Sequence, residues 1–145
     1  LALANMEVLN PGGEGAGRQG ETGVDHVGYT YASLRELLEN WAVLRERGIT
    51  PYWSIHHGMT VSLYYADPDG NQMEFQVDCL ASGERASEFM ARTFGQNPIG
   101  VEFDPEEWLA RLRSGTPEAE LLKRASNEPV SPLRGAIAGY VRAAN

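Results

Sequence analysis

The feature that most limits how this chain can fold is one amphipathic helix whose two ends are clearly marked. Ser33 and Glu36 form a capping box at its start, and Gly48 supplies the residue of positive φ that often follows a helix. Between these signals, apolar side chains recur at helical spacing: Leu34, Leu37, Leu38, Trp41 and Leu44. The sequence therefore predicts a helix with a single apolar face.

Strand patterns lie on both sides of this helix. Residues 24–31 alternate between two faces and are rich in β-forming side chains. We expect a second strand at residues 49–55 and a third at residues 60–65, which is rich in β-branched and aromatic residues. The turn Asp67–Gly70 then leads into a fourth strand at residues 72–78. The predicted order is strand, helix, strand, strand, strand.

Length and charge exclude several classes of protein. The 145 residues fit one domain. A formal net charge of −8 and a pI of about 4.8 argue against nucleic-acid binding, which depends on clustered Lys and Arg. No apolar run approaches the roughly 20 residues of a membrane span. Cys79 is the single cysteine, which excludes an internal disulfide and suits a cytoplasmic protein.

The N-terminal flank carries no chemical motif. Residues 1–9 have enough apolar side chains for a short strand separated from its partners, and we expect the natural protein to continue upstream of Leu1. Residues 10–23 are a glycine-rich connector. Within it, Gly15–Gly20 matches the spacing of a dinucleotide-binding loop. That interpretation is rejected because no helix follows directly.

A mainly helical extension is predicted beyond residue 80. The expected elements are helices at 87–94, at 105–113 with Asp104 as N-cap and at 117–124 with Thr116 as N-cap, an extended segment at 127–132, and a frayed helix at 133–144. The predicted organisation is therefore residues 1–22 as the end of a preceding module plus the connector, 23–80 as the central module and 81–145 as the extension.

Glu74 and His26 are the two candidate metal ligands. In its strand, Glu74 faces away from the apolar side chains of Met73 and Phe75, toward either solvent or a polar cavity. His26 lies mid-strand, where a histidine is either a hydrogen-bonded core residue or a ligand. If the first and last strands are neighbours, both side chains converge on one point. One imidazole and one carboxylate are two thirds of the 2-His-1-carboxylate triad that binds Fe(II).

His57 and Tyr64 are the candidate catalytic residues. His57 lies in the connection between the second and third strands and is either a surface residue or a group that binds an oxygen and moves protons. Tyr64 is either a core tyrosine or a hydrogen-bond donor to a substrate oxygen. Trp41 and Trp53 are assigned to packing.

These residues together resemble a known family. The segment Asp25-His26-Val27-Gly28-Tyr29, then His57-Gly58, then Tyr64 with Asp67–Glu74, resembles the last βαβββ module of type I extradiol ring-cleavage dioxygenases (catechol 2,3-dioxygenase-like). These belong to the vicinal oxygen chelate superfamily, with the glyoxalases and bleomycin-resistance proteins. The resemblance covers residues 23–80, and Leu1–Ala4 resembles the end of the preceding module.

The resemblance implies a fold, a metal and a reaction. The expected fold is α+β, with one βαβββ module whose four strands form a mixed, curved sheet. His26 and Glu74 match the second and third Fe(II) ligands, with Mn(II) as a substitute metal. His57 matches a histidine near the oxygen-binding position, and Tyr64 matches a tyrosine that binds a catecholic oxygen. The implied reaction is cleavage of a catechol-type ring with O₂, in aromatic compound catabolism.

The sequence also departs from the family. Its first histidine ligand and its acid–base histidine lie in the preceding module, and the three histidines of this chain are already placed. We therefore expect this chain alone to be inactive. We also expect at least a dimer, since such modules pair to close their cavity, with exchange of the Leu1–Leu9 strand as one route.

Two other functions remain open at this stage. One is a glyoxalase-like isomerase or lyase, in which His26 and Glu74 of two chains share one metal ion. The other is a metal-free module that binds an aromatic compound or antibiotic. Metal content separates the metal-free binding module from the two metal enzymes. Oxygen consumption separates the dioxygenase from the isomerase.

Overall fold

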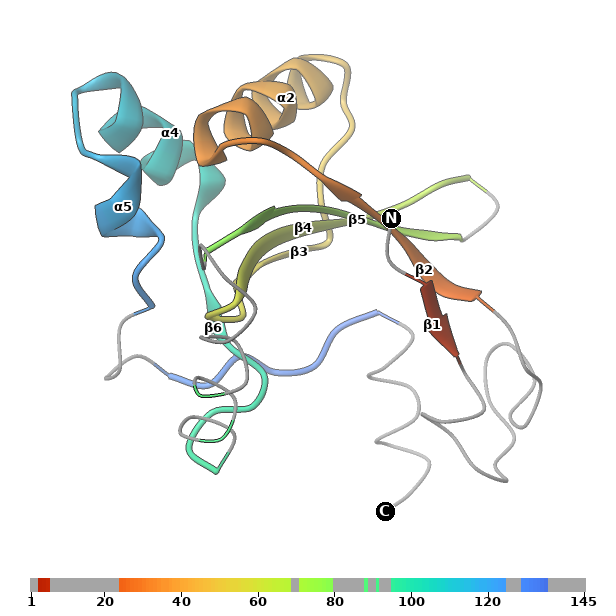
Figure 1. The fold of residues 1–145 in the computed structure, drawn as a ribbon. Coiled ribbons are helices and arrows are strands. Elements are labelled where there is room, and N and C mark those ends of the chain that lie inside the picture. Colours follow the sequence, from red (N-terminus) through yellow and green to blue (C-terminus); the bar gives the residue numbers. More distant parts are fainter. Residues whose placement is uncertain are drawn as a thin grey trace.

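The computed structural model describes residues 3–5, 24–68, 71–79, 88, 91, 95–124 and 129–135. Its strands and helices, labelled in Figure 1, are β1 (Leu3–Asn5), β2 (Val24–Thr30), α2 (Leu34–Glu46), β3 (Trp53–His56), β4 (Thr60–Ala66), β5 (Gln72–Asp78), β6 (Val101–Glu102), α4 (Pro105–Arg113) and α5 (Glu118–Leu121).

One mixed sheet contains all the described strands. Its order is β1-β2-β5-β4-β3-β6, with β2 and β5 parallel and every other neighbouring pair antiparallel. This confirms the predicted α+β class. The prediction of four strands was too low, because β1 and β6 extend the sheet at its two edges. The four predicted strands are its contiguous centre, and β2, first in the module, lies beside β5, last in the module.

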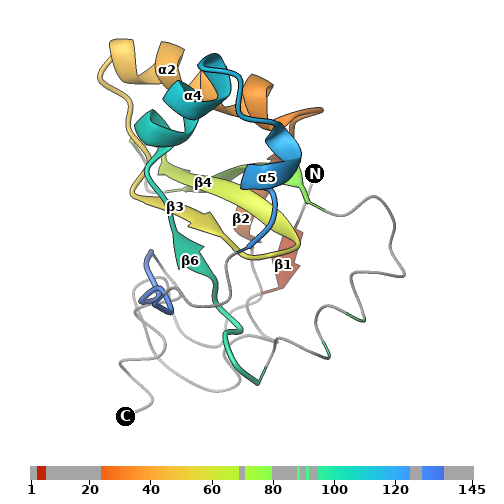
Figure 2. The ribbon, with the colours of Figure 1, turned by 90° about the vertical axis from the view of Figure 1, so that its left-hand side faces the viewer.

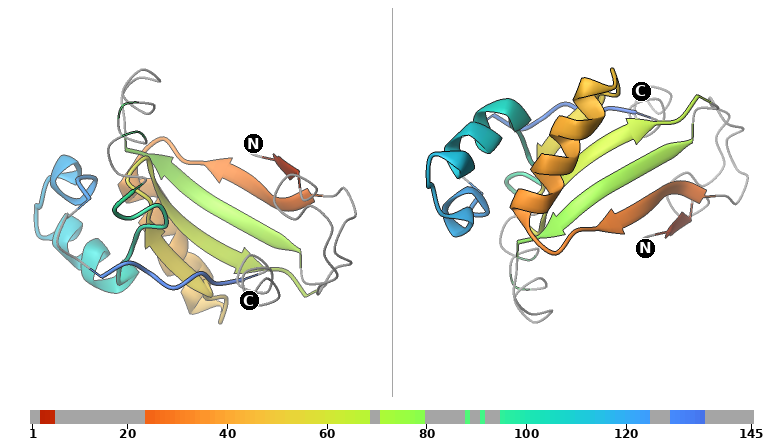
Figure 3. Two further views of the ribbon diagram at one scale, coloured as in Figure 1. Left: turned by 90° about the horizontal axis from the view of Figure 1, so that it is seen from below. Right: turned by 90° about the horizontal axis from the view of Figure 1, so that it is seen from above.

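The helices cover one face of this sheet. α2, α4 and α5 all lie on the same side, and α2 crosses over the central strands (Figures 2 and 3). The core fills the space between them; its buried members include Leu37 and Leu38 of α2, Val61, Leu63 and Tyr65 of β4, and Leu109 and Leu112 of α4. Residues 129–135 pass on the opposite side of the sheet (Figure 1). That opposite face is where the polar side chains of β4 and β5 point.

The predicted caps of α2 are confirmed. Ser33 Oγ accepts a hydrogen bond of 3.1 Å from the Glu36 amide, and Gly48 follows the helix with φ of 77°. The Glu36 carboxylate accepts from the amide of Ala32, one residue before the position that a capping box specifies. The apolar stripe is buried at Leu34, Leu37, Leu38 and Trp41, so Trp41 packs as expected.

Two predicted elements have different bounds. β3 begins at Trp53 and not at Ile49, because the Ile49 amide donates to the Leu44 carbonyl and so still belongs to the end of α2. α5 is confined to Glu118–Leu121, and its N-cap is Pro117, which makes no side-chain cap, in place of Thr116. The predicted helix at 105–113 is confirmed, with Asp104 accepting from the Glu106 amide.

The flanking predictions are tested only in part. β1 pairs antiparallel with β2 of the same chain, so the expectation of a strand separated from its partners was wrong. The connector at residues 10–23 lies outside the described residues. So does the helix predicted at 87–94, except for Glu88 and Ala91, which are helical. Of the last predicted helix, only residues 133–135 are described, and they are not helical.

Candidate metal centre

His26 and Glu74 meet on the sheet face opposite the helices. In the parallel β2–β5 pair, Glu74 lies opposite Gly28 and His26 lies opposite Gln72, so the two ligand candidates are diagonal neighbours on one face. Their Nε2 and Oε2 atoms are 3.0 Å apart. Gly28 directly opposite Glu74 has no side chain, which leaves space for the imidazole to reach the carboxylate.

Tyr64 and His57 continue this contact into a chain of polar groups. Tyr64 lies directly opposite Glu74 in the antiparallel β4–β5 pair, and its hydroxyl donates to Glu74 Oε1 at 2.8 Å. His57 Nε2 lies 3.2 Å from the same hydroxyl. All the site residues predicted from the sequence are therefore brought together in one connected group.

The hydrogen bonds also fix the tautomer of His57. Nδ1 lies 2.5 Å from the Ile99 carbonyl oxygen, which can only accept, so Nδ1 carries the hydrogen. In the neutral ring, Nε2 then has a lone pair directed at the Tyr64 hydroxyl, whose proton is donated to Glu74. His57 Nε2 is thus a hydrogen-bond and proton acceptor facing the site.

Hydrogen bonding keeps the Glu74 carboxylate charged, and burial keeps the His57 imidazole neutral. Burial raises the pKa of Glu74, but the hydrogen bonds from His26, Ser62 and Tyr64 outweigh it, and the net pKa of the carboxyl is lowered. Burial is the main reason that the pKa of His57 is lowered, against the opposite effect of the Ile99 carbonyl. Glu74 is 5% exposed, so this negative charge sits in a largely water-excluded place.

An aromatic wall that the sequence did not identify borders these residues. Trp53, assigned to packing, is stacked on Tyr64 with ring centroids 5.2 Å apart, and it lies perpendicular to the His57 ring with centroids 5.8 Å apart. The Trp53 indole N–H donates to Ser131 Oγ at 3.1 Å, which ties residues 129–135 to this face. Trp53 belongs to the site because it pairs opposite Tyr64 in the β3–β4 ladder, and this register cannot be predicted from the residue pattern of one strand.

The donor pair suits a divalent metal ion. Two protein atoms bonded to one ion at about 2.1 Å in adjacent positions lie about 3 Å apart. His26 Nε2 and Glu74 Oε2 are 3.0 Å apart, a separation that is compatible with a shared ion and is also that of the hydrogen bond between them. Among the described residues, no group of three or more His, Cys, Asp or Glu side chains could hold a metal ion. The pair fits a metal, but supplies two ligands of a facial triad.

Comparisons with known proteins find two similar dioxygenases. The chain is 42% identical over 99 residues to biphenyl-2,3-diol 1,2-dioxygenase 2 of Rhodococcus globerulus, covering 68% of this chain and 52% of the relative. It is 38% identical over 104 residues to biphenyl-2,3-diol 1,2-dioxygenase 3 of the same organism, covering 71% and 55%. The chain spans about half the length of these curated relatives. No family model and no solved structure matches it.

The mixed sheet with its covering helices is compatible with a module of the vicinal oxygen chelate kind. More particularly, the chain is homologous to a C-terminal part of the type I extradiol dioxygenases, which confirms the resemblance drawn from its motifs. In the part of the chain that the structure describes, no helix is long and apolar enough to cross a membrane.

Proposed function

We propose that this chain is the C-terminal module of an Fe(II)-dependent extradiol dioxygenase that cleaves a catechol-type ring with O₂. The observation that carries the proposal is the 3.0 Å contact between His26 and Glu74, with Tyr64 and His57 joined to it. The similarity to two biphenyl-2,3-diol dioxygenases supports the same reaction class.

Each side chain has a specific task in this proposal. His26 and Glu74 hold the ion; a bound Fe(II) would supply the Lewis-acid and redox chemistry that catechol and O₂ require. The Tyr64 hydroxyl binds a catecholic oxygen, and stacking on Trp53 fixes the direction of that hydroxyl. His57 Nε2, neutral and oriented by the Ile99 carbonyl, accepts a hydrogen bond or a proton beside the ring.

The chain on its own is proposed to be inactive. The third ligand and the acid–base residue must come from a second module, since the described residues provide two ligands. Residues 23–80 are proposed as the metal-binding module, with residues 1–22 leading into it and residues 81–145 as the extension. A catechol-type compound and O₂ are the proposed small-molecule partners, and the protein is proposed to be at least a dimer.

A chimera tests this function. The N-terminal half of either Rhodococcus relative is joined to this chain, reconstituted with Fe(II) without oxygen, and assayed for O₂ uptake with biphenyl-2,3-diol. We expect uptake that Glu74→Gln abolishes together with the bound iron. Glu46→Gln, an exposed glutamate at the end of α2, is the matched control and leaves both unchanged. Full iron binding by the Glu74→Gln chimera would contradict the proposal.

A glyoxalase-like isomerase or lyase is the second candidate. It is favoured by the fact that each chain presents one His–Glu pair, so two chains would complete a four-ligand site without any other residue. The metal content of the unfused chain separates the isomerase from the dioxygenase. One metal ion per dimer, absent from the Glu74→Gln variant, selects the isomerase if the chimera also takes up no O₂. No metal binding in either form selects the metal-free binding module.

A further inference from the structure

His57 is held in place by residues of the C-terminal extension. Its ring Nδ1 donates to the Ile99 carbonyl oxygen at 2.5 Å, and its own carbonyl oxygen accepts from Arg124 Nη1 at 2.9 Å. These two partners follow His57 by 42 and 67 residues, so both lie beyond the module that contains the candidate metal ligands. The side chain and the main chain of one proposed catalytic residue are therefore both fixed from outside that module.

Asn97 fixes the loop that carries the Ile99 carbonyl. Its Oδ1 accepts from the amides of Gly100 at 2.7 Å and Ile99 at 3.2 Å, and its Nδ2 donates to the Gly100 carbonyl oxygen at 3.0 Å. Asn97 is 9% exposed, so water does not readily replace these hydrogen bonds. A loop closed by its own buried side chain has little freedom to turn the Ile99 carbonyl away from His57.

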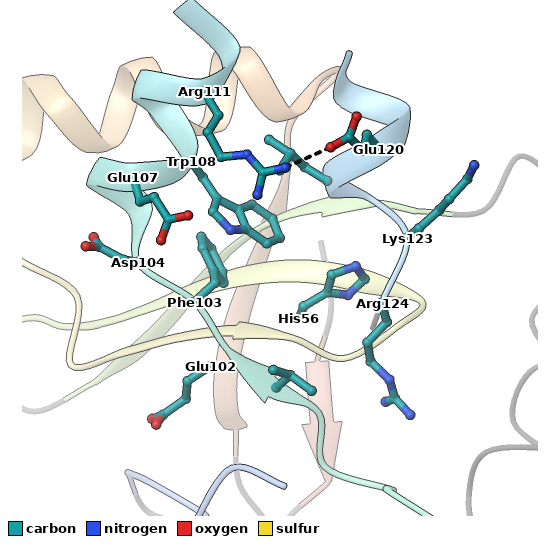
Figure 4. Close-up of a pocket in the computed structure, with 12 residues that line it drawn as sticks. His56, Glu102, Phe103, Asp104, Glu107, Trp108, Arg111, Glu120, Lys123 and Arg124 are labelled. Carbon is teal, nitrogen blue, oxygen red and sulfur yellow. Dashed lines mark hydrogen bonds and ion pairs between the residues drawn. The ribbon is translucent and has the colours of Figure 1, made fainter. Parts of the chain in front are cut away.

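Arg124 joins this loop to the segment that carries His57. The same nitrogen, Nη1, donates to the carbonyl oxygens of His57 at 2.9 Å and Asn97 at 3.2 Å. Hydrogen bonds from a charged donor are stronger than those between neutral groups. Figure 4 shows Arg124 near His56, with its side chain directed away from that of Lys123. Arg124 is half-buried and Lys123 is exposed, so the Arg124 charge serves a contact between two segments of the fold.

His56 and His57 are neighbours with opposite neutral tautomers. His56 Nδ1 accepts from the Gly58 amide at 3.0 Å, which leaves the hydrogen on Nε2. His57 Nδ1 faces a carbonyl oxygen and so carries the hydrogen itself. The Ile99 carbonyl therefore sets the tautomer of His57, because without that acceptor the ring can carry its hydrogen on either nitrogen. A hydrogen on Nε2 would turn the proton acceptor beside Tyr64 into a donor.

We propose that Asn97 and Arg124 are positioning residues for His57. Together they hold the Ile99 carbonyl against Nδ1, so that Nε2 keeps the lone pair that faces Tyr64. This rests on the proposed function, in which the same Nε2 accepts a hydrogen bond or a proton beside the catechol ring. Neither Asn97 nor Arg124 needs to touch the substrate, because both act through His57. Residues 97–100 and the segment after α5 are thereby part of the catalytic apparatus.

NMR of the full chain, labelled with ¹⁵N-histidine and kept in EDTA, tests this placement. The imidazole nitrogen signals report which nitrogen carries the hydrogen. In the wild-type protein we expect the hydrogen of His57 on Nδ1 and that of His56 on Nε2. In Arg124→Met and in Asn97→Ala, His57 becomes a mixture of both tautomers and His56 does not change. A wild-type tautomer of His57 in both variants would overturn the proposal.

A conservative variant and a neighbouring variant separate positioning from a general loss of structure. Arg124→Lys keeps one charged nitrogen, and a single nitrogen makes both carbonyl contacts, so we expect it to retain the wild-type tautomer of His57. Lys123→Met removes a charge from the exposed neighbouring residue and leaves both histidines unchanged. If either variant disturbed His57 as much as Arg124→Met does, the assignment would be wrong.

Turnover by the chimera gives a second readout. We expect Arg124→Met to lower kcat about tenfold, as a partial loss of proton transfer through His57, and to leave KM for biphenyl-2,3-diol and the iron content unchanged. An unchanged kcat, with or without a raised KM, would contradict the role. The tautomers are measured without iron or turnover. An inactive wild-type chimera therefore counts against the proposed function and leaves the NMR test of Asn97 and Arg124 intact.

Discussion

The hydroxyl oxygen of Tyr65 is a single atom that lowers the stability of the fold. Its ring is part of the core and packs on Phe75, but its hydroxyl is buried and has no hydrogen-bond partner in the described structure. Burial accordingly raises the pKa of this phenol. An unsatisfied buried hydroxyl costs roughly 1–3 kcal/mol, so this side chain is a site where the sequence is not optimal for stability.

Tyr65→Phe is therefore expected to stabilise the protein by about 1 kcal/mol, because it removes the unsatisfied group and keeps the ring. Urea unfolding followed by far-UV circular dichroism measures the change. Tyr29→Phe is the control: Tyr29 is 47% exposed, so loss of its hydroxyl leaves the midpoint unchanged. A lower midpoint for Tyr65→Phe would mean that the hydroxyl has a partner in solution.

His56 links stability to pH. Burial is the main cause that lowers its pKa from 6.5 to about 4, against the opposite effect of the Leu122 carbonyl. Between these two values the unfolded chain binds more protons than the folded one, so stability falls as the pH is lowered through this window. The full effect is about 3 kcal/mol.

The free energy of unfolding, measured in urea at pH 7 and pH 5, checks this expectation. The wild-type protein loses stability over this interval, and His56→Asn loses less because it has no imidazole to protonate at this position. Comparing the two proteins cancels the contribution of every other titrating group. The same pH dependence in both would show that His56 is not the source.

At the scale of elements, Gly100 controls how closely β6 approaches β3. Its φ is +128°, and a Cβ at this position would lie 2.5 Å from the His56 carbonyl oxygen, which is backbone and cannot move aside. The Gly100 carbonyl also accepts from the Ser131 amide, so this glycine connects β6 to residues 129–135 as well. The aromatic wall on the metal side depends on this placement, because Ser131 also accepts a hydrogen bond from the Trp53 indole.

Gly100→Ala is expected to destabilise the protein by about 2 kcal/mol or more, from the strained φ and the clash together. Gly95→Ala is the matched control, since an added Cβ there meets nothing within 4 Å. Thermal unfolding of the two variants beside the wild type gives the comparison. Equal melting temperatures for both variants would show that the chain relaxes around residue 100.

The elements that the sequence predicted well are those with local signals. α2 is specified by its caps and its stripe, and β5 by a turn followed by strict alternation. β3 was placed too early, because its start depends on pairing with β4, which is a contact between distant residues. Likewise, His26 and Glu74 could be selected by residue type and strand face, whereas Trp53 required the register of the folded sheet.

At the scale of the whole molecule, a metal site on the sheet face that carries His26 and Glu74 needs further ligands from outside the described residues. His26 and Glu74 supply two ligands, and the described residues offer no third. β1 pairs with β2 of its own chain, so association through exchange of this strand is not required by the fold. The remaining way for two chains to complete one site is to place their metal faces together, each contributing its His–Glu pair.

The isomerase candidate therefore predicts a dimer whose stability increases with a divalent metal ion. Size-exclusion chromatography with light scattering should give twice the chain mass of 15.9 kDa at micromolar concentration. A metal ion held by both chains stabilises only the associated state, so EDTA should shift the protein toward monomer. Glu74→Gln should abolish the metal effect, because it removes a ligand charge, and Glu46→Gln should retain it. A strict monomer with metal at micromolar concentration would show that the site is completed by a different module and not by a second copy.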